Sequence, residues 1–229
     1  SVPQGPAPAQ ERAIDLMVER HNVAMLGPAG TGKSWATSKG VEILRQNSLI
    51  VAITATTGRA ALDIGGTTLH SWAGVGLGKE DVDELLKRAR RNKRVRERWC
   101  HTDVLVIDEV SMLDAEFFDK LDEIGRRIRR VPEPFGGLQV VAGGDFLQLP
   151  PINGKYVFHS ARWHECFPAD HSVVFRYNFR QQSDARLQDI LADVRAGNLS
   201  AESKALLEAR VNFPLPPELN VDPPLVLAR

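Results

Sequence analysis

Residues 27–34 carry the chemistry that is easiest to recognise in this chain. They read GPAGTGKS and match the pattern G-x-x-x-x-G-K-[ST], after an apolar run and before a helical pattern. The glycines allow backbone N–H groups to surround phosphate oxygens, and the N-terminus of the following helix favours negative charge. We expect Lys33 to reach the β- and γ-phosphates of a nucleotide and the Ser34 hydroxyl to bind Mg²⁺. The predicted phosphate site comprises Gly27, Pro28, Ala29, Gly30, Thr31, Gly32, Lys33 and Ser34.

A second signal, VLVIDEVSM at 104–112, ends an apolar run with two adjacent carboxylates. We expect Asp108 to lie beside the magnesium ion and Glu109 to orient or activate the attacking water. A solvated strand end can carry the same two letters, so the pair is informative because it accompanies the phosphate loop. Together the motifs predict ATP hydrolysis, with ATP and Mg²⁺ as cofactors. A small-molecule kinase is the less favoured alternative, because no segment reads as its lid or acceptor pocket.

Apolar runs that alternate with amphipathic segments form the frame for these residues. We expect strands at 22–26, 49–54, 104–107, 138–142 and 172–175. Helical patterns follow Lys33 and cover a long segment near 80–99, residues 115–130 and residues 184–197. Strands that are apolar throughout and separated by helices predict an α/β fold, in which a parallel sheet carries helices on both faces.

Length and composition bound the class of protein. The chain has 229 residues, of which 43% are hydrophobic and 25% charged, and its formal net charge is zero. Any contact with nucleic acid must therefore come from a local patch. No apolar run approaches the ~20 residues of a membrane span, so we expect a soluble protein with no membrane partner. Two cysteines without paired spacing favour free thiols in a reducing, intracellular compartment.

The stretch that follows the two carboxylates resembles one family of motor proteins. Its letters are VSMLDAEFFDKLDEIGRRIRR (110–130), then PFGG (134–137), then GGDFLQLPP (143–151). With the motifs above, this order is similar to that of the Pif (petite integration frequency) DNA helicases, 5′-to-3′ enzymes of superfamily 1 related to RecD. The resemblance runs from about Gln10 to Leu206 and implies a RecA-like P-loop NTPase domain.

The resemblance implies three more residues at the nucleotide. Gln10, which we place ahead of the first helix, is similar to the glutamine that reads adenine. Gln148, in the loop after the fourth predicted strand, is similar to an amide that senses the γ-phosphate. Arg180, in FRYNFRQ (175–181), is similar to an arginine that contacts the γ-phosphate.

The resemblance also implies a track for single-stranded DNA. The motifs that line it resemble TATTGRAA (54–61), TTLHSWAGVG (67–76) and the loop that contains Gln148. An aromatic ring on such a track can stack on any base, and we favour this role for His70. For Trp72, a place in the core is an equally good interpretation. The predicted DNA-binding residues are Thr56, Gly58, His70, Trp72, Phe146 and Pro150.

Two basic clusters allow two interpretations. The first is KRARRNKRVRER at 87–98, and the second comprises Arg126, Arg127, Arg129 and Arg130. Either could contact DNA phosphates. We favour a solvated helix face for both, because most charge runs are solvated faces.

For the whole protein, the resemblance implies an ATP-dependent DNA helicase that translocates 5′ to 3′ on single-stranded DNA, unwinds duplexes and serves genome maintenance. The implied partners are single-stranded DNA, forked or structured DNA, and a second RecA-like domain. We expect residues 1–9 to be a linker or cloning remnant, 10–208 the first RecA-like domain, and 209–229 a linker with the start of the second. The expected compartment is the nucleus or mitochondrion of a eukaryote, or the cytoplasm of a bacterium. A nucleotide-gated DNA-binding or regulatory module without motor activity is the alternative.

Overall fold

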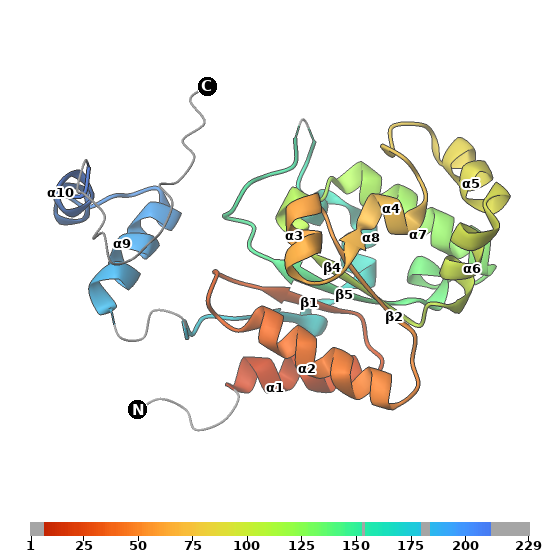
Figure 1. The fold of residues 1–229 in the computed structure, drawn as a ribbon, viewed down its shortest axis with the longest axis horizontal. Helices are drawn as coiled ribbons and strands as arrows, with labels where there is room; N and C mark the ends of the chain where they lie inside the picture. The colour runs from red at the N-terminus through yellow and green to blue at the C-terminus, as the bar shows by residue number, and fades with distance from the viewer. Residues whose placement is uncertain (1–6, 153, 180–183, 212–229) are drawn as a thin grey trace. The chain divides into compact units, whose positions relative to one another are not determined.

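The computed structural model describes residues 7–152, 154–179 and 184–211. Six strands form one parallel sheet in the order β3-β2-β4-β5-β1-β6. Figure 1 shows β1, β2, β4 and β5 side by side in this sheet. They are β1 (Val23–Leu26), β2 (Val51–Ala55), β3 (Thr67–Thr68), β4 (Val104–Asp108), β5 (Gln139–Gly144) and β6 (Ser172–Val174). The five predicted strands are confirmed. The sequence pattern missed β3, because its 2 residues are too few to show a period.

Helices connect the strands of the first compact unit, residues 1–182. They are α1 (Pro8–Val18), α2 (Lys33–Gln46), α3 (Gly58–Asp63), α4 (Leu69–Ala73), α5 (Val82–Arg91), α6 (Lys93–His101), α7 (Ala115–Arg129) and α8 (Ala161–Cys166). Short 3₁₀ turns are η1 (Val110–Met112), η2 (Pro134–Gly137), η3 (Val157–His159) and η4 (Ala169–His171). The helices predicted after Lys33 and at 115–130 are confirmed.

Two details differ from the expectation. The segment near 80–99 is two helices, because the Asn92 side chain accepts hydrogen bonds from the N–H groups of Arg94 and Val95 and so starts a new helix. Gln10 lies inside α1, not ahead of it. Its Oε1 accepts a hydrogen bond of 2.9 Å from the N–H of Ala7, which fixes the side chain at the start of that helix.

The second compact unit, residues 183–229, contains α9 (Ala185–Ala196) and α10 (Ala201–Glu208). α9 confirms the helix predicted at 184–197. The carboxylate of Asp193 accepts hydrogen bonds from the N–H of Ser200 (3.2 Å) and the hydroxyl of Ser203 (2.8 Å), which joins the two helices. The division between the units falls between residues 182 and 183, and the domain boundary expected at 208 stays a prediction.

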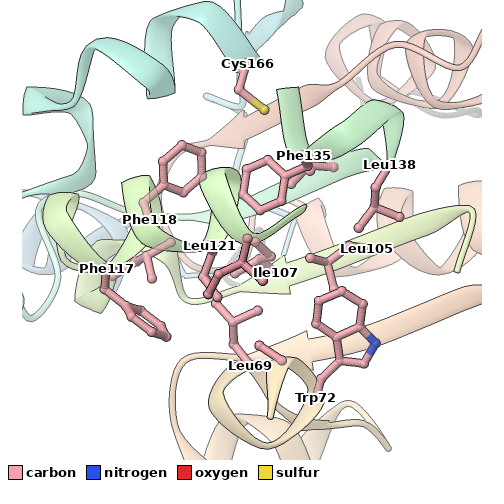
Figure 2. Close-up of a cluster of buried hydrophobic side chains, with 14 of the residues drawn as sticks. Leu69, Trp72, Leu105, Ile107, Phe117, Phe118, Leu121, Phe135, Leu138 and Cys166 are labelled. Atoms are coloured by element: carbon pink, nitrogen blue, oxygen red, sulfur yellow. The ribbon is translucent and has the colours of Figure 1, made fainter. Parts of the chain in front are cut away.

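Side chains of the strands alternate between two hydrophobic cores, one on each face of the sheet. In β4, Val104 and Val106 belong to the core under α1 and α2, whereas Leu105 and Ile107 belong to the larger core under α4 to α8. Figure 2 shows part of the larger core, where side chains of α4 and α7 meet those of β4. Helices on both faces of a parallel sheet confirm the predicted α/β architecture. Within the described residues, no helix is both long and apolar enough to cross a membrane.

The segment that carries the family resemblance, α7 with the turn after it, is tied together by a buried carboxylate. Asp122 is 2% exposed. It accepts hydrogen bonds of 2.7 Å from the Phe135 N–H and from Nε of Arg126, and it pairs with Arg162. Arg129 donates to the carbonyl oxygens of Trp99 (2.7 Å) and Gly136 (2.7 Å). These contacts join α7, α8 and η2 to one another, and Arg129 joins α7 to α6.

Candidate functional site

The phosphate loop joins β1 to α2 and packs closely on the segment after β6. Gly27 has a φ of 148°. A Cβ at this position would lie 2.2 Å from the carbonyl oxygen of Phe175, so glycine alone fits there. Lys33 Nζ donates hydrogen bonds to the carbonyl oxygens of Gly27 (2.7 Å) and Pro28 (2.9 Å). The amino group is therefore held inside the curve of the loop.

Asp108 and Glu109 lie at the carboxyl end of β4, which β5 separates from the phosphate loop. Burial raises the pKa of Asp108, against the opposing effects of a hydrogen bond from the Glu109 N–H and the charge of Lys33. Burial and the charge of Asp108 raise the pKa of Glu109, Lys33 opposes this shift, and Asp145 adds to it. Both carboxyl groups hold a proton more tightly than they would in water, and a bound cation would favour the charged form of each.

The backbone at Glu109 is strained and is held from a neighbouring strand. Glu109 has φ 57° and ψ 44°, a left-handed conformation that costs a non-glycine residue about 1–2 kcal/mol. At the end of β2, the hydroxyl of Thr56 donates a 2.9 Å hydrogen bond to the Glu109 carbonyl oxygen. The Thr56 N–H donates a 3.2 Å bond to the Asp108 carbonyl oxygen. Strain of this kind is typical of functional sites.

A cavity of about 800 Å³ opens at this edge of the sheet. It brings together six residues that the sequence predicted: Ala29, Gly30, Gly32, Lys33, Ser34 and Gln148, with the predicted carboxylates Asp108 and Glu109. The sequence interpretation missed further residues of its lining: Trp35, Ala60, Asp63, Ile64, Gly144, Asp145 and Phe179. Arg180 lies outside the described residues.

Gln10 lies beside the last glycine of the phosphate loop. Gly32 has a φ of 86°, and a Cβ on it would lie 2.0 Å from Nε2 of Gln10 and 3.6 Å from Cδ2 of Phe179. The Gln10 side chain is almost fully buried, with 5% exposed. The amide thus adjoins the 800 Å³ cavity at the β1 and β6 side, away from the carboxylates of β4.

A second cavity, of about 540 Å³, lies over the C-terminal end of β2 and the start of α4. Thr56 and His70 line it, with Pro151, Lys79 and Lys120. The ring of His70 is stacked on that of Phe117, with centroids 4.3 Å apart and planes 9° apart. Burial lowers the pKa of His70, so the imidazole is neutral at neutral pH. We call this cavity the His70 groove.

The structure decides one predicted DNA contact and leaves another as a prediction. Trp72 (Figure 2) is 3% exposed, which supports its place in the larger core, where it packs against Trp99. The ring of Phe146 packs edge-on against Phe158 at 4.8 Å and Tyr156 at 6.0 Å, in an aromatic cluster beside the core. Burial in the core removes the indole of Trp72 from water more completely than a surface groove would. Phe146 is half-buried, and its contact with DNA stays a prediction.

Gly58 and Pro150 are exposed, at the start of α3 and in the loop after β5. No described atom lies within 4 Å of the Cβ position of Gly58, so its surface is open. The neighbour of Pro150, Pro151, lines the His70 groove. For Gly58 and Pro150, a DNA contact stays a prediction.

Part of each basic cluster has a structural partner. In the first cluster, Arg88, Arg90 and Arg98 are held by the Glu80 carboxylate and by the carbonyl oxygens of Val75, Arg127 and Ser71. In the second, Arg126 and Arg127 pair with carboxylates, and Arg129 binds carbonyl oxygens. These contacts favour the interpretation of solvated and structural helix faces.

Sequence signals for three missed residues do exist. Trp35 directly follows the lysine and serine of the phosphate loop, and Asp145 directly follows β5 as Glu109 directly follows β4. Phe179 is the neighbour of Arg180, and its N–H donates a 2.7 Å hydrogen bond to the Gly30 carbonyl oxygen. Attention to the residues next to each motif would have found all three.

Known proteins with a similar sequence match most of this chain. A family model described as PIF1-like helicase matches residues 9–205. The ATP-dependent DNA helicase PIF1 of Saccharomyces cerevisiae is 42% identical over 218 residues, which cover 90% of this chain and 25% of that protein. The chain thus spans about a quarter of this relative's length.

Solved structures give the same result. The crystal structure of Pif1 helicase from Candida albicans has a TM-score of 0.86 and 40% identity, over 92% of this chain and 48% of that one. The crystal structure of Bacteroides Pif1 bound to single-stranded DNA has a TM-score of 0.74 and 25% identity, over 90% and 50% of the two chains. These likenesses confirm the predicted RecA-like fold. The chain belongs to the PIF1-like helicase family.

Proposed function

We propose that this chain is the first RecA-like domain of an ATP-dependent DNA helicase, and that the 800 Å³ cavity binds and hydrolyses ATP. The observation that carries the proposal is the hydrogen bond from Thr56 to the carbonyl of Glu109. It joins a residue of the His70 groove to the backbone of Glu109, the residue whose carboxylate is placed to activate water. A phosphate site alone would support any P-loop enzyme, whereas this link supports a motor that senses DNA.

Each side chain has a role in the proposed hydrolysis. Lys33 neutralises charge on the β- and γ-phosphates, and Glu109, whose pKa is raised, accepts a proton from the attacking water. Gln148 lines the same cavity and contacts the γ-phosphate or that water, because an amide can both donate and accept. Arg180, as the resemblance implies, approaches the γ-phosphate.

The residues present fit a magnesium ion. The Ser34 hydroxyl and the Asp108 carboxylate both line the cavity, and oxygen ligands suit Mg²⁺. Burial raises the pKa of Asp108, and a nearby dication would favour the charged carboxylate. When bound, Mg²⁺ would neutralise charge that develops on the phosphate oxygens.

We propose that single-stranded DNA passes over the His70 groove. A base would stack on the His70 ring, which Phe117 supports from behind, and the exposed Lys79 would meet phosphates. Thr56 would transmit a change in the groove to the strained turn at Glu109. Relatives with the name ATP-dependent DNA helicase support this proposal, as does the likeness to a Pif1 bound to single-stranded DNA.

For the whole protein, we propose 5′-to-3′ translocation and unwinding of forked or structured DNA in genome maintenance. A second RecA-like domain would complete the ATP site, since the chain covers about half of the Candida albicans Pif1 chain. Such an enzyme would act where DNA is, in the nucleus or mitochondrion of a eukaryote or in the cytoplasm of a bacterium.

The test is ATP turnover with and without single-stranded DNA, in a form that includes the second motor domain. We expect DNA to stimulate turnover, and Lys33→Ala to lower it by about 10²–10³-fold, since a donor to a charged transition state is lost. DNA affinity without nucleotide should stay near that of the wild type. The matched control is Ile50→Ala, which removes an exposed side chain near the opposite edge of the sheet.

If single-stranded DNA does not change the rate of ATP turnover, and DNA binding depends on nucleotide, the alternative of a gated DNA-binding module is favoured. Turnover that survives Lys33→Ala would contradict the assignment of the phosphate site.

A further inference from the structure

Trp35 stands apart from the other tryptophans of the chain. Its exposed fraction is 49%, whereas Trp72, Trp99 and Trp163 are 3%, 0% and 4% exposed. Within residues 7–152, 154–179 and 184–211, its indole has no aromatic neighbour and its N–H has no hydrogen-bond acceptor. A large aromatic side chain left in water is costly to keep unless something covers it.

Trp35 faces the 800 Å³ cavity in which we place the nucleotide. It lies in the first turn of α2, three residues after Gly32, and residues three apart share a helix face. Gly32 and Trp35 both line the 800 Å³ cavity, and so does Phe179. The indole therefore lines the cavity from the helix that begins directly after Gly32, the glycine beside the Gln10 amide.

The two ends of this cavity differ in chemistry. At the β4 end lie Asp108 and Glu109, which suit phosphate, metal and water. On the β1 and β6 side, the ring of Phe179 and the Gln10 amide lie beside Gly32, and the indole of Trp35 lines the cavity from the first turn of α2. A nucleoside triphosphate has the same polarity, because a flat aromatic base lies at the end opposite its γ-phosphate.

We propose that Trp35 is a base-binding residue, whose indole stacks on the base of the bound nucleotide. This rests on the proposed ATP site and assigns the side chain at the apolar end of it. Stacking is tolerant of base identity, since every base has a π-face. Trp35 thus supplies affinity for nucleotides in general, and selection of adenine is left to an edge contact such as that of Gln10.

The assignment makes a prediction that other roles of an exposed tryptophan do not. A stacking residue contributes to the affinity for ligands that contain a base and does not contribute to the affinity for ligands without one. A residue that shapes the phosphate loop affects both kinds of ligand. A residue that packs on a second domain affects turnover but not nucleotide affinity in the chain of residues 1–229.

The experiment measures the binding of Mg²⁺ complexes of ATP, GTP and inorganic tripolyphosphate to the protein by calorimetry. We expect Trp35→Ala to weaken ATP and GTP alike, by about 5- to 150-fold, the range for loss of one base–aromatic stack. Tripolyphosphate affinity should change by less than about twofold. Trp35→Phe should retain most of the ATP affinity, and Ile50→Ala, the exposed control, should behave as the wild type.

Intrinsic fluorescence gives an independent readout, because the other three tryptophans are buried. ATP and GTP should protect the emission of Trp35 from acrylamide quenching, and tripolyphosphate should not. Unchanged ATP affinity in Trp35→Ala, or an equal loss for tripolyphosphate, would overturn the assignment of Trp35 and leave the phosphate site intact. A wild-type protein that binds none of the three ligands would overturn the ATP site and this inference with it.

Discussion

The nucleotide cavity and the His70 groove differ in how they are built. The cavity collects residues that directly follow β1, β4 and β5, and the carboxyl ends of these neighbouring parallel strands meet at one edge. The groove instead combines the end of β2, α4, the segment after it, α7 and the loop after β5. The predicted residues Lys33, Ser34, Asp108, Glu109 and Gln148 line this one cavity, whereas Trp72 of the predicted track lies in the core and Phe146 packs beside it. The sheet topology determines which residues meet at the carboxyl ends of the strands. The residues that line a site made of loops and helices depend instead on which side chains are buried in the core.

The largest expected effect is in the cavity. Glu109→Gln keeps the shape of the side chain and removes the base, so we expect turnover to fall by about 10²–10⁴-fold while ATP binding persists. The measurement is single-turnover hydrolysis with bound ATP quantified in parallel. Normal hydrolysis by this variant would show that another group accepts the proton.

The raised pKa of Glu109 gives this prediction a pH dependence. The base acts when charged, so turnover of the wild type should rise as pH increases through the raised pKa. The free energy of unfolding changes in the opposite direction as pH increases. The folded state holds the proton more tightly than the unfolded state, so stability present below the ordinary pKa is lost as pH rises through the raised one. Glu109→Gln should therefore unfold at a higher temperature than the wild type above this window and at the same temperature below it.

The groove gives the next largest effect, and a matched pair of variants tests it. His70→Ala should weaken binding of single-stranded DNA by about 1–3 kcal/mol for every base sequence, with a small loss of stability. Trp72→Ala should do the reverse, because it leaves a cavity in the core and costs about 3–5 kcal/mol of unfolding free energy. Fluorescence anisotropy with homopolymeric oligonucleotides and thermal unfolding separate the two. A sequence-selective loss in His70→Ala would exclude stacking as its contribution.

The smallest effect concerns the connection between the regions. Gln148 lines the nucleotide cavity, and Pro151, three residues later, lines the groove. Gln148→Ala should leave ATP affinity within about severalfold but lower the stimulation of turnover by DNA, because a group shifts an equilibrium when it contacts the two states differently. Thr56→Val, which removes the hydroxyl bond to Glu109, should lower the same ratio. The ratio of turnover with and without DNA, and unwinding per ATP, are measured on one preparation. An unchanged ratio in both variants would mean that coupling follows another route.

Much of the fold was predictable because its signals are local. Apolar runs predicted five strands, and the loop with glycines at 27, 30 and 32 predicted its own position between a strand and a helix. The break at Asn92 was missed, because both helices share one amphipathic pattern and the cap is a single side chain. Trp35 was missed because a tryptophan in a sequence is usually interpreted as a core residue. Whether it is exposed depends on which face of its helix packs on the sheet.

The sequence by itself determined the phosphate loop, the two carboxylates after β4 and the parallel α/β architecture. The residues of each motif lie within a few positions of one another, so spacing along the chain equals proximity in space. Each strand and helix of the architecture is likewise a local pattern. The tertiary structure decided the rest: that His70 stacks on Phe117, that Trp72 is core and Trp35 is not, and that Thr56 holds Glu109. These outcomes join residues far apart in the chain, and which side chain is buried there depends on packing between elements that no local pattern encodes.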